Sequence, residues 1–187
     1  MSLSPAPEAL ERLIEALKQR VTAHTGVTLD DTLETLPLVD AVLRDAADAE
    51  TFADCRDLLI EAGAYFGELM RLHLNGRWAH ANRGPEGWRI ELAPCFLHFS
   101  PVGMVAEVLT GSEHEAYDGA FAALPELHGA LNEMLDRAPP LPEDEYYSLS
   151  GRSEVLCMVT DWLIGCATTD DSLKKSYSDE DYRTRLG

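Results

Sequence analysis

Hydrophobic periodicity changes abruptly at Asn75-Gly76, and this change limits the folds open to the chain. On the N-terminal side, apolar residues recur every three or four positions, as on one face of an α-helix. On the C-terminal side, Trp88, Ile90 and Leu92 alternate with polar or small residues, which indicates a strand with one buried face. The Asn-Gly pair can supply the left-handed residue that ends a helix. The chain therefore combines helices with a sheet.

The predicted fold class is α+β, a helix-rich single domain with a small antiparallel three-stranded meander packed on helices. Helices are expected over residues 7–75, the longest of them over about 49–74. The meander is expected over 77–100, where short connections favour antiparallel pairing. Further helices are expected over 101–168, and the polar segment 169–187 is expected to fray. Helices on both sides of one short meander favour α+β over a wound parallel sheet.

Proline and glycine divide the C-terminal half of the chain. Pro101 opens a predicted helix that Gly111 ends. One or two helices are expected over Ala116–Leu135, and a last one over Ser153–Ala167. Between them, Ala138–Pro142 is an extended, proline-rich connector and the best candidate for a boundary.

The chain is strongly acidic, with 33 Asp and Glu against 15 Lys and Arg and a formal net charge of −18. Residues 30–57 and 113–146 hold much of this excess. Such a surface repels nucleic-acid phosphates, so nucleic-acid binding is not expected. It attracts basic proteins and speeds their encounter. A second interpretation, that the acidic residues only keep the surface solvated, stays open.

The sequence also predicts a compartment. No stretch approaches the roughly 18 consecutive apolar residues of a membrane span, and Met1–Pro7 lacks the features of a secretory signal. A cytoplasmic location without membrane contact is therefore expected. The cysteines fall within apolar patterns and form no C-x-x-C pair, which favours small core residues over a disulfide. They are Cys55, Cys95, Cys157 and Cys166.

Several enzyme motifs are missing from the sequence. It contains no glycine-rich phosphate loop, no H-E-x-x-H zinc helix and no G-x-S-x-G nucleophile elbow. No spacing of Cys or His predicts zinc. Because catalytic groups can be scattered along a chain, these absences make an enzyme less expected without excluding one. No cofactor and no bound metal are predicted.

Two glycines lie four residues apart on the predicted long helix, Gly63 and Gly67. Glycine within a helix costs about 1 kcal/mol relative to alanine, so such a pair indicates that another element approaches closely. The Trp78 strand or the first helix is expected to be that element. Glu68 precedes Arg71 by three residues, within reach of an ion pair. One interpretation is a tight helix–sheet joint with a surface ion pair, and the other is a ligand-binding cleft.

The second interpretation requires several polar side chains to converge at the helix–sheet junction. His80 and His98 lie on predicted strands, where a meander could place them on one sheet face near Arg89 or Trp78. The candidate ligand-binding residues are Tyr65, Glu68, Arg71, Trp78, His80, Arg89 and His98.

Three short patterns occur in order along the central part of the chain. They are Gly-x-Tyr-Phe-Gly-Glu at 63–68, Gly-x-Trp at 76–78 and Pro-Val-x-Met-Val-x-x-Val-x-x-Gly at 101–111. Over residues 62–111 the chain resembles a group of uncharacterised bacterial domains of unknown function. The resemblance implies a helix that leads into a tryptophan-bearing strand, a small sheet and a short helix. It implies no reaction.

Two functions of different classes are consistent with these features. The preferred one is a non-catalytic acidic protein-interaction module, either an adaptor or an immunity-type inhibitor of a basic partner. The alternative is a small-molecule-binding or cryptic enzymatic protein with its site at the helix–sheet junction.

Overall fold

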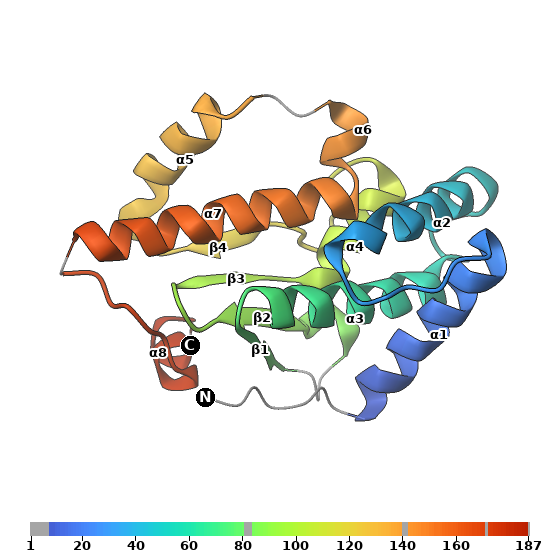
Figure 1. The fold of residues 1–187 in the computed structure, drawn as a ribbon, viewed down its shortest axis with the longest axis horizontal. Coiled ribbons are helices and arrows are strands. Elements are labelled where there is room, and N and C mark those ends of the chain that lie inside the picture. Colours follow the sequence, from blue (N-terminus) through green and yellow to red (C-terminus); the bar gives the residue numbers. More distant parts are fainter. Residues whose placement is uncertain (1–7, 81–83, 140–141, 171, 187) are drawn as a thin grey trace.

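The computed structural model describes residues 8–80, 84–139, 142–170 and 172–186. Its fold is α+β, as predicted, with helices packed around an antiparallel four-stranded sheet (Figure 1). The helices are α1 (Glu8–Thr25), α2 (Leu36–Ala49), α3 (Arg56–His73), α4 (Pro101–Thr110), α5 (His128–Arg137), α6 (Glu143–Tyr146), α7 (Leu149–Thr169) and α8 (Asp179–Leu186). The strands are β1 (Gly76–Ala79), β2 (Arg89–Leu92), β3 (Leu97–Phe99) and β4 (Phe121–Ala123).

The ends of α3 and α4 follow from local sequence. Asn75, just after α3, has φ of 56°, so the left-handed residue lies where the Asn-Gly pair predicts it. Ser100 caps α4 by accepting a hydrogen bond from the Gly103 N–H at 3.1 Å. Gly111 ends α4 with φ of 61°.

The long helix begins later than predicted. α3 starts at Arg56, whereas the apolar pattern extends back to about residue 49. The Thr51 hydroxyl donates to the Asp54 carboxylate at 2.6 Å, and the Asp54 N–H donates to the Thr51 carbonyl at 2.9 Å. These local bonds satisfy the backbone in a turn and so compete with the helix.

The sheet has the order β1-β2-β3-β4, and each neighbouring pair is antiparallel. Trp78 lies opposite Ile90, and Ile90 lies opposite Phe99, so these side chains share one face. This apolar face packs on α3 and supplies much of the core. Arg77, Glu91 and His98 lie on the other face.

A fourth strand, β4, was not predicted. The expected helix over Ala116–Leu135 is wrong in its first part, because Phe121 and Ala123 pair with Phe99 and Leu97 of β3. The outer edge of β3 presents backbone groups that need partners, and this long-range pairing overrides the local apolar pattern. Only α5 forms as a full helix in that segment.

The two glycines of α3 mark close approaches, of the predicted Trp78 strand at Gly67 and of α4, not the first helix, at Gly63. A Cβ on Gly63 would lie 2.6 Å from the Val102 side chain, on α4. A Cβ on Gly67 would overlap the indole ring of Trp78, on β1. The helix therefore meets both the sheet and α4 at glycine backbone.

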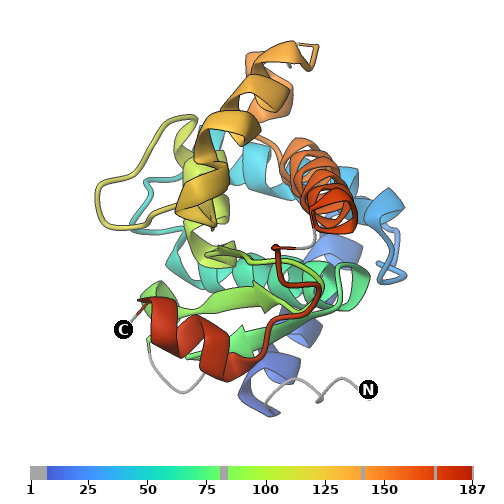
Figure 2. The same ribbon diagram turned by 90° about the vertical axis from the view of Figure 1, so that its left-hand side faces the viewer.

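The described residues of the C-terminal segment include the helix α8, where the sequence predicts a frayed tail over 169–187. α8 lies beside the sheet, at the left in Figure 1 and in front of it in Figure 2. Tyr182 is fully buried, and its hydroxyl accepts a hydrogen bond from the Leu97 N–H at 2.9 Å. The same hydroxyl lies 2.9 Å from the Leu92 carbonyl oxygen. One aromatic side chain thus holds a polar helix that local composition alone would leave unfolded.

α7 also begins earlier than the predicted Ser153. Asp40, buried on α2, accepts hydrogen bonds from the backbone N–H groups of Leu149 (2.6 Å) and Ser150 (3.1 Å). A carboxylate at the first N–H groups satisfies donors that a helix leaves free. The Ser148 hydroxyl also caps α7 by accepting a hydrogen bond from the Gly151 N–H at 2.9 Å. A local cap and a residue more than 100 positions away therefore set this helix end together.

Three further findings concern the described part of the chain. β1 ends at Ala79, and His80 follows it with φ of 60°, so His80 is not on a strand. The centre of the expected connector, residues 140–141, lies outside the described residues. None of the described helices is long and apolar enough to cross a membrane.

We expect Gly67→Ala to lower the free energy of unfolding by about 1–3 kcal/mol, because the new methyl group meets an indole held at Nε1 by Glu68. The matched control is Gly165→Ala on α7, where nothing lies within 4 Å of the added Cβ. That change should stabilise the protein by up to about 1 kcal/mol. Urea unfolding followed by circular dichroism measures both. Equal stabilisation by the two changes would show that no close approach exists at Gly67.

Candidate functional site

The predicted site residues separate into groups on different sides of the sheet. In the first group, the Glu68 carboxylate accepts hydrogen bonds from Arg71 Nε (2.8 Å), Arg71 Nη2 (2.7 Å) and Trp78 Nε1 (2.9 Å). Burial disfavours the charged form of Glu68, but these bonds outweigh it and hold its pKa below the ordinary value. The three residues join α3 to β1. The ion pair is not on the surface as expected, because Arg71 is buried.

The second group lies on the polar face of the sheet. Glu91 is only 2% exposed and bridges two guanidinium groups, Arg77 Nη2 at 2.9 Å and Arg89 Nη2 at 2.5 Å. His80 Nε2 lies 3.4 Å from Arg89 Nη2. The Arg77 guanidinium also lies 4.9 Å from the centre of the Tyr182 ring. Burial of this network under α8 makes it a joint between the tail and the sheet.

His98 completes the polar face, opposite Glu91 in the register. Its ring packs edge-on against Phe96 and Tyr182. Burial and the nearby positive charge of Arg89 lower the pKa of His98 to about 4. The ring is therefore neutral at pH 7. The structure brings His98 near Arg89 as predicted, while Trp78 lies on the opposite face.

Tyr65 belongs to neither group. It is buried, and its hydroxyl has no hydrogen-bond partner in the part of the chain that the structure describes. Burial raises its pKa. Tyr65 and Glu68 line a groove of about 380 Å³ between α1 and α3. The candidate residues therefore do not converge on one cavity.

A larger cleft, of about 480 Å³, opens between α1, α2 and the start of α3. Its lining includes the buried apolar residues Val42, Cys55 and Leu58. Four carboxylates also line this cleft, which we name the acidic cleft. They are Asp45, Glu50, Asp54 and Asp57.

The two basic residues of the acidic cleft already have partners. Arg20 Nε donates to Glu61 at 2.9 Å, and this hydrogen bond raises the pKa of Arg20. His24 Nε2 lies 2.9 Å from Asp45. No cation lies within 4 Å of the other three carboxylates among the described residues. The cleft therefore has spare negative charge above an apolar surface.

Carboxylates also outnumber cations in the chain as a whole. At least ten of the 15 Lys and Arg are within 4 Å of a carboxylate of the chain itself. Internal pairing therefore occupies at least ten of the 15 cations, while the carboxylates outnumber the cations by 18.

Comparisons with known proteins assign this chain to no family. The chain matches no protein-family model, no curated protein and no solved structure. Among the described residues, no group of three or more His, Cys, Asp or Glu is placed to hold a metal ion.

Sequence reasoning missed Arg77 and Glu91, although strand alternation could have found them. Glu91 lies two residues after Arg89 and so shares its face. For the acidic cleft, the sequence offers one signal, the acidic composition of residues 30–57. Its basic residues come from α1, and only the fold brings them to this segment.

We expect His98 to make folding less favourable as the pH falls from about 6.5 to about 4, because the unfolded chain binds a proton there and the buried ring does not. The variant His98→Gln should therefore lose less stability between pH 7 and about pH 5 than the wild type. Urea unfolding at both pH values measures this difference. The exposed His73, changed to Gln, is the control for loss of an imidazole outside the core. Identical pH dependence in all three proteins would contradict the assignment.

Proposed function

We propose that the protein is a non-catalytic interaction module whose acidic cleft binds a basic segment of a partner protein, as an adaptor or an immunity-type inhibitor would. The observation that carries this proposal is a set of three carboxylates beside an apolar surface that have no cation within 4 Å among the described residues, Glu50, Asp54 and Asp57. A cytoplasmic location in a bacterium belongs to the same proposal.

The cleft suits the two parts of a lysine or arginine side chain. Its aliphatic stem can pack on Val42 and Leu58, while its charged head meets the carboxylates. Hydrogen bonds between an ionised donor and an ionised acceptor are about twice as strong as neutral ones. The Thr51 hydroxyl holds the Asp54 carboxylate in place at 2.6 Å, so part of the cleft is preorganised.

The overall charge of −18 supports the same function at longer range. An acidic surface steers a basic partner during diffusion and raises the association rate. Salt screens this attraction over about 10 Å at an ionic strength of 0.1 M. Affinity for a basic partner should therefore fall steeply with salt.

A small-molecule site at the helix–sheet junction is the second candidate function. The buried Tyr65 hydroxyl without a described partner, at the groove beside α1, favours it. Against it, Glu68, Arg71 and Trp78 bind one another. The acidic cleft is therefore preferred.

The test uses a fluorescein-labelled oligo-arginine peptide and fluorescence anisotropy. We expect the triple variant Glu50→Gln/Asp54→Asn/Asp57→Asn to raise the dissociation constant about tenfold or more, because each lost charge contact is worth about 0.5–1 kcal/mol. A matched control, Glu113→Gln/Glu115→Gln/Asp136→Asn, removes the same charge from exposed residues elsewhere. It should change the dissociation constant by about twofold at most.

The comparison of the two triple variants decides the result. Equal losses of affinity would show that the peptide senses only the net charge, and the acidic cleft would then not be the site. Absence of binding by the wild type at low ionic strength would contradict the proposed function itself.

A further inference from the structure

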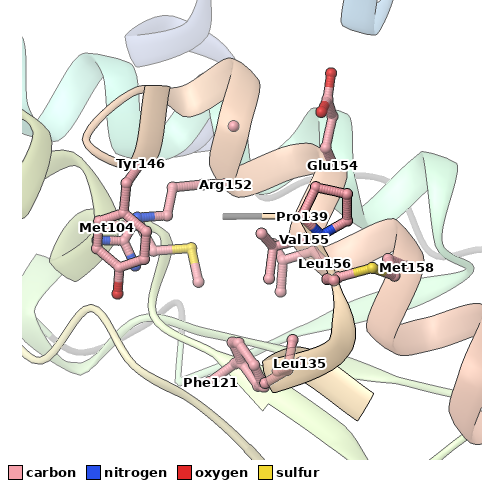
Figure 3. Close-up of a pocket in the computed structure, with 12 residues that line it drawn as sticks. Met104, Phe121, Leu135, Pro139, Tyr146, Arg152, Glu154, Val155, Leu156 and Met158 are labelled. Atoms are coloured by element: carbon pink, nitrogen blue, oxygen red, sulfur yellow. The ribbon is translucent and has the colours of Figure 1, made fainter. Parts of the chain in front are cut away.

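A second cavity, of about 580 Å³, lies beside α7 and is separate from the acidic cleft. Residues of α4, β4, α5 and α7 surround it, and Figure 3 shows their side chains facing a common space. The volume falls within the range of about 300–1,000 Å³ typical of small-molecule sites. Its apolar lining includes Met104, Phe121, Leu135, Val155 and Met158.

Arg152 brings a charged group to one end of this apolar cavity, next to Tyr146 and Met104 (Figure 3). Its side chain is about nine-tenths buried. Nη2 donates to the Glu107 carboxylate at 2.6 Å, and the guanidinium lies 4.4 Å from the centre of the Tyr146 ring. These contacts hold the guanidinium in place at the cavity wall.

The Nε atom of Arg152 is buried and has no hydrogen-bond partner among the described residues. An unsatisfied buried donor costs about 1–3 kcal/mol, and native structures rarely leave one. Less than 1 Å² of this atom is accessible, so it does not face the cavity. The surface that the cavity offers to a ligand is therefore mainly apolar.

The charges around this cavity favour one class of ligand. Glu107 already neutralises Arg152 in a protein of net charge −18, and the Glu154 carboxylate points away from the cavity (Figure 3). An anionic group would therefore meet net repulsion. The flexible thioethers of Met104 and Met158 can adjust to ligands of different shape.

We propose that this cavity binds an uncharged, mainly apolar small molecule. This site is independent of the acidic cleft, because the two share no lining residue. The protein would then carry a small-molecule site in addition to its partner-binding surface.

The probe is Nile red, an uncharged dye with an apolar body and one carbonyl group, whose fluorescence rises in apolar surroundings. We expect saturable binding of one dye per chain. The variant Val155→Phe places a ring in the cavity and should raise the dissociation constant about tenfold or more, since the added volume excludes the dye. The matched control is Ile164→Phe, at an exposed site of the same helix outside the cavity lining. It should leave the constant unchanged.

Displacement from the wild-type protein tests the ligand class without relying on a variant. Methyl octyl ketone should displace Nile red at a concentration about tenfold lower than decanoate, which has the same number of carbons and a negative charge. Equal or better displacement by decanoate would overturn the proposal of an uncharged ligand. Binding of one dye per two chains would instead indicate an interface between copies and would also overturn it.

The salt dependence of binding distinguishes this inference from the proposed function. Nile red affinity should be nearly constant between about 50 mM and about 500 mM NaCl, because the dye is uncharged. Oligo-arginine binding should fall over the same range. Loss of one binding activity alone therefore does not contradict the proposal for the other. Dye binding that does not saturate, or equal effects of Val155→Phe and Ile164→Phe, would refute the cavity site.

Discussion

α3 meets Trp78 and Val102 at the backbone of Gly67 and Gly63, and the positions of the sheet and of α4 depend on this contact. Without side chains at the two glycines, the indole ring can lie against the helix and reach Glu68 with its Nε1. The hydrogen bond then fixes the ring, so the joint combines close packing with a directed polar contact. Because β1 is held in this way, the apolar face of the whole sheet lies toward α3.

The opposite face of the sheet depends on that orientation. Alternation along the strands places Arg77, Arg89 and Glu91 together, where the carboxylate bridges the two guanidinium groups. A slip of one residue in β2 would move Glu91 into the core without a partner, which disfavours any other register. α8 then covers this face through Tyr182. Packing on one side of the sheet thus creates the polar platform on the other.

The two proposed binding sites differ in the chemistry of their linings. The acidic cleft lies among α1, α2 and α3 and carries carboxylates that have no cation within 4 Å in the described part of the chain. The cavity beside α7 is mainly apolar and holds one guanidinium, whose charge Glu107 balances. An acidic exterior favours cations at the first site and uncharged molecules at the second. The ligands proposed for the two sites therefore differ in charge.

The sequence by itself determined the features that rest on neighbours along the chain. The change of period at Asn75, the helix that Ser100 caps and Gly111 ends, and the need for a close approach at Gly67 all follow from local residues. The α+β class and most helices follow from the same patterns. Of the predicted site, the Glu68–Arg71 pair was predictable because the residues are one helical turn apart.

Only the tertiary structure decided the elements whose partners are distant in sequence. β4 is a strand because β3 offers an edge, and α8 forms where Tyr182 finds backbone partners. At the start of α7, Asp40 accepts the first N–H groups in addition to the local cap by Ser148. Both binding sites also collect side chains from several elements. Local propensities are worth a fraction of a kcal/mol per residue, whereas a buried polar group without a partner costs about 1–3 kcal/mol, so long-range contacts prevail where the two compete.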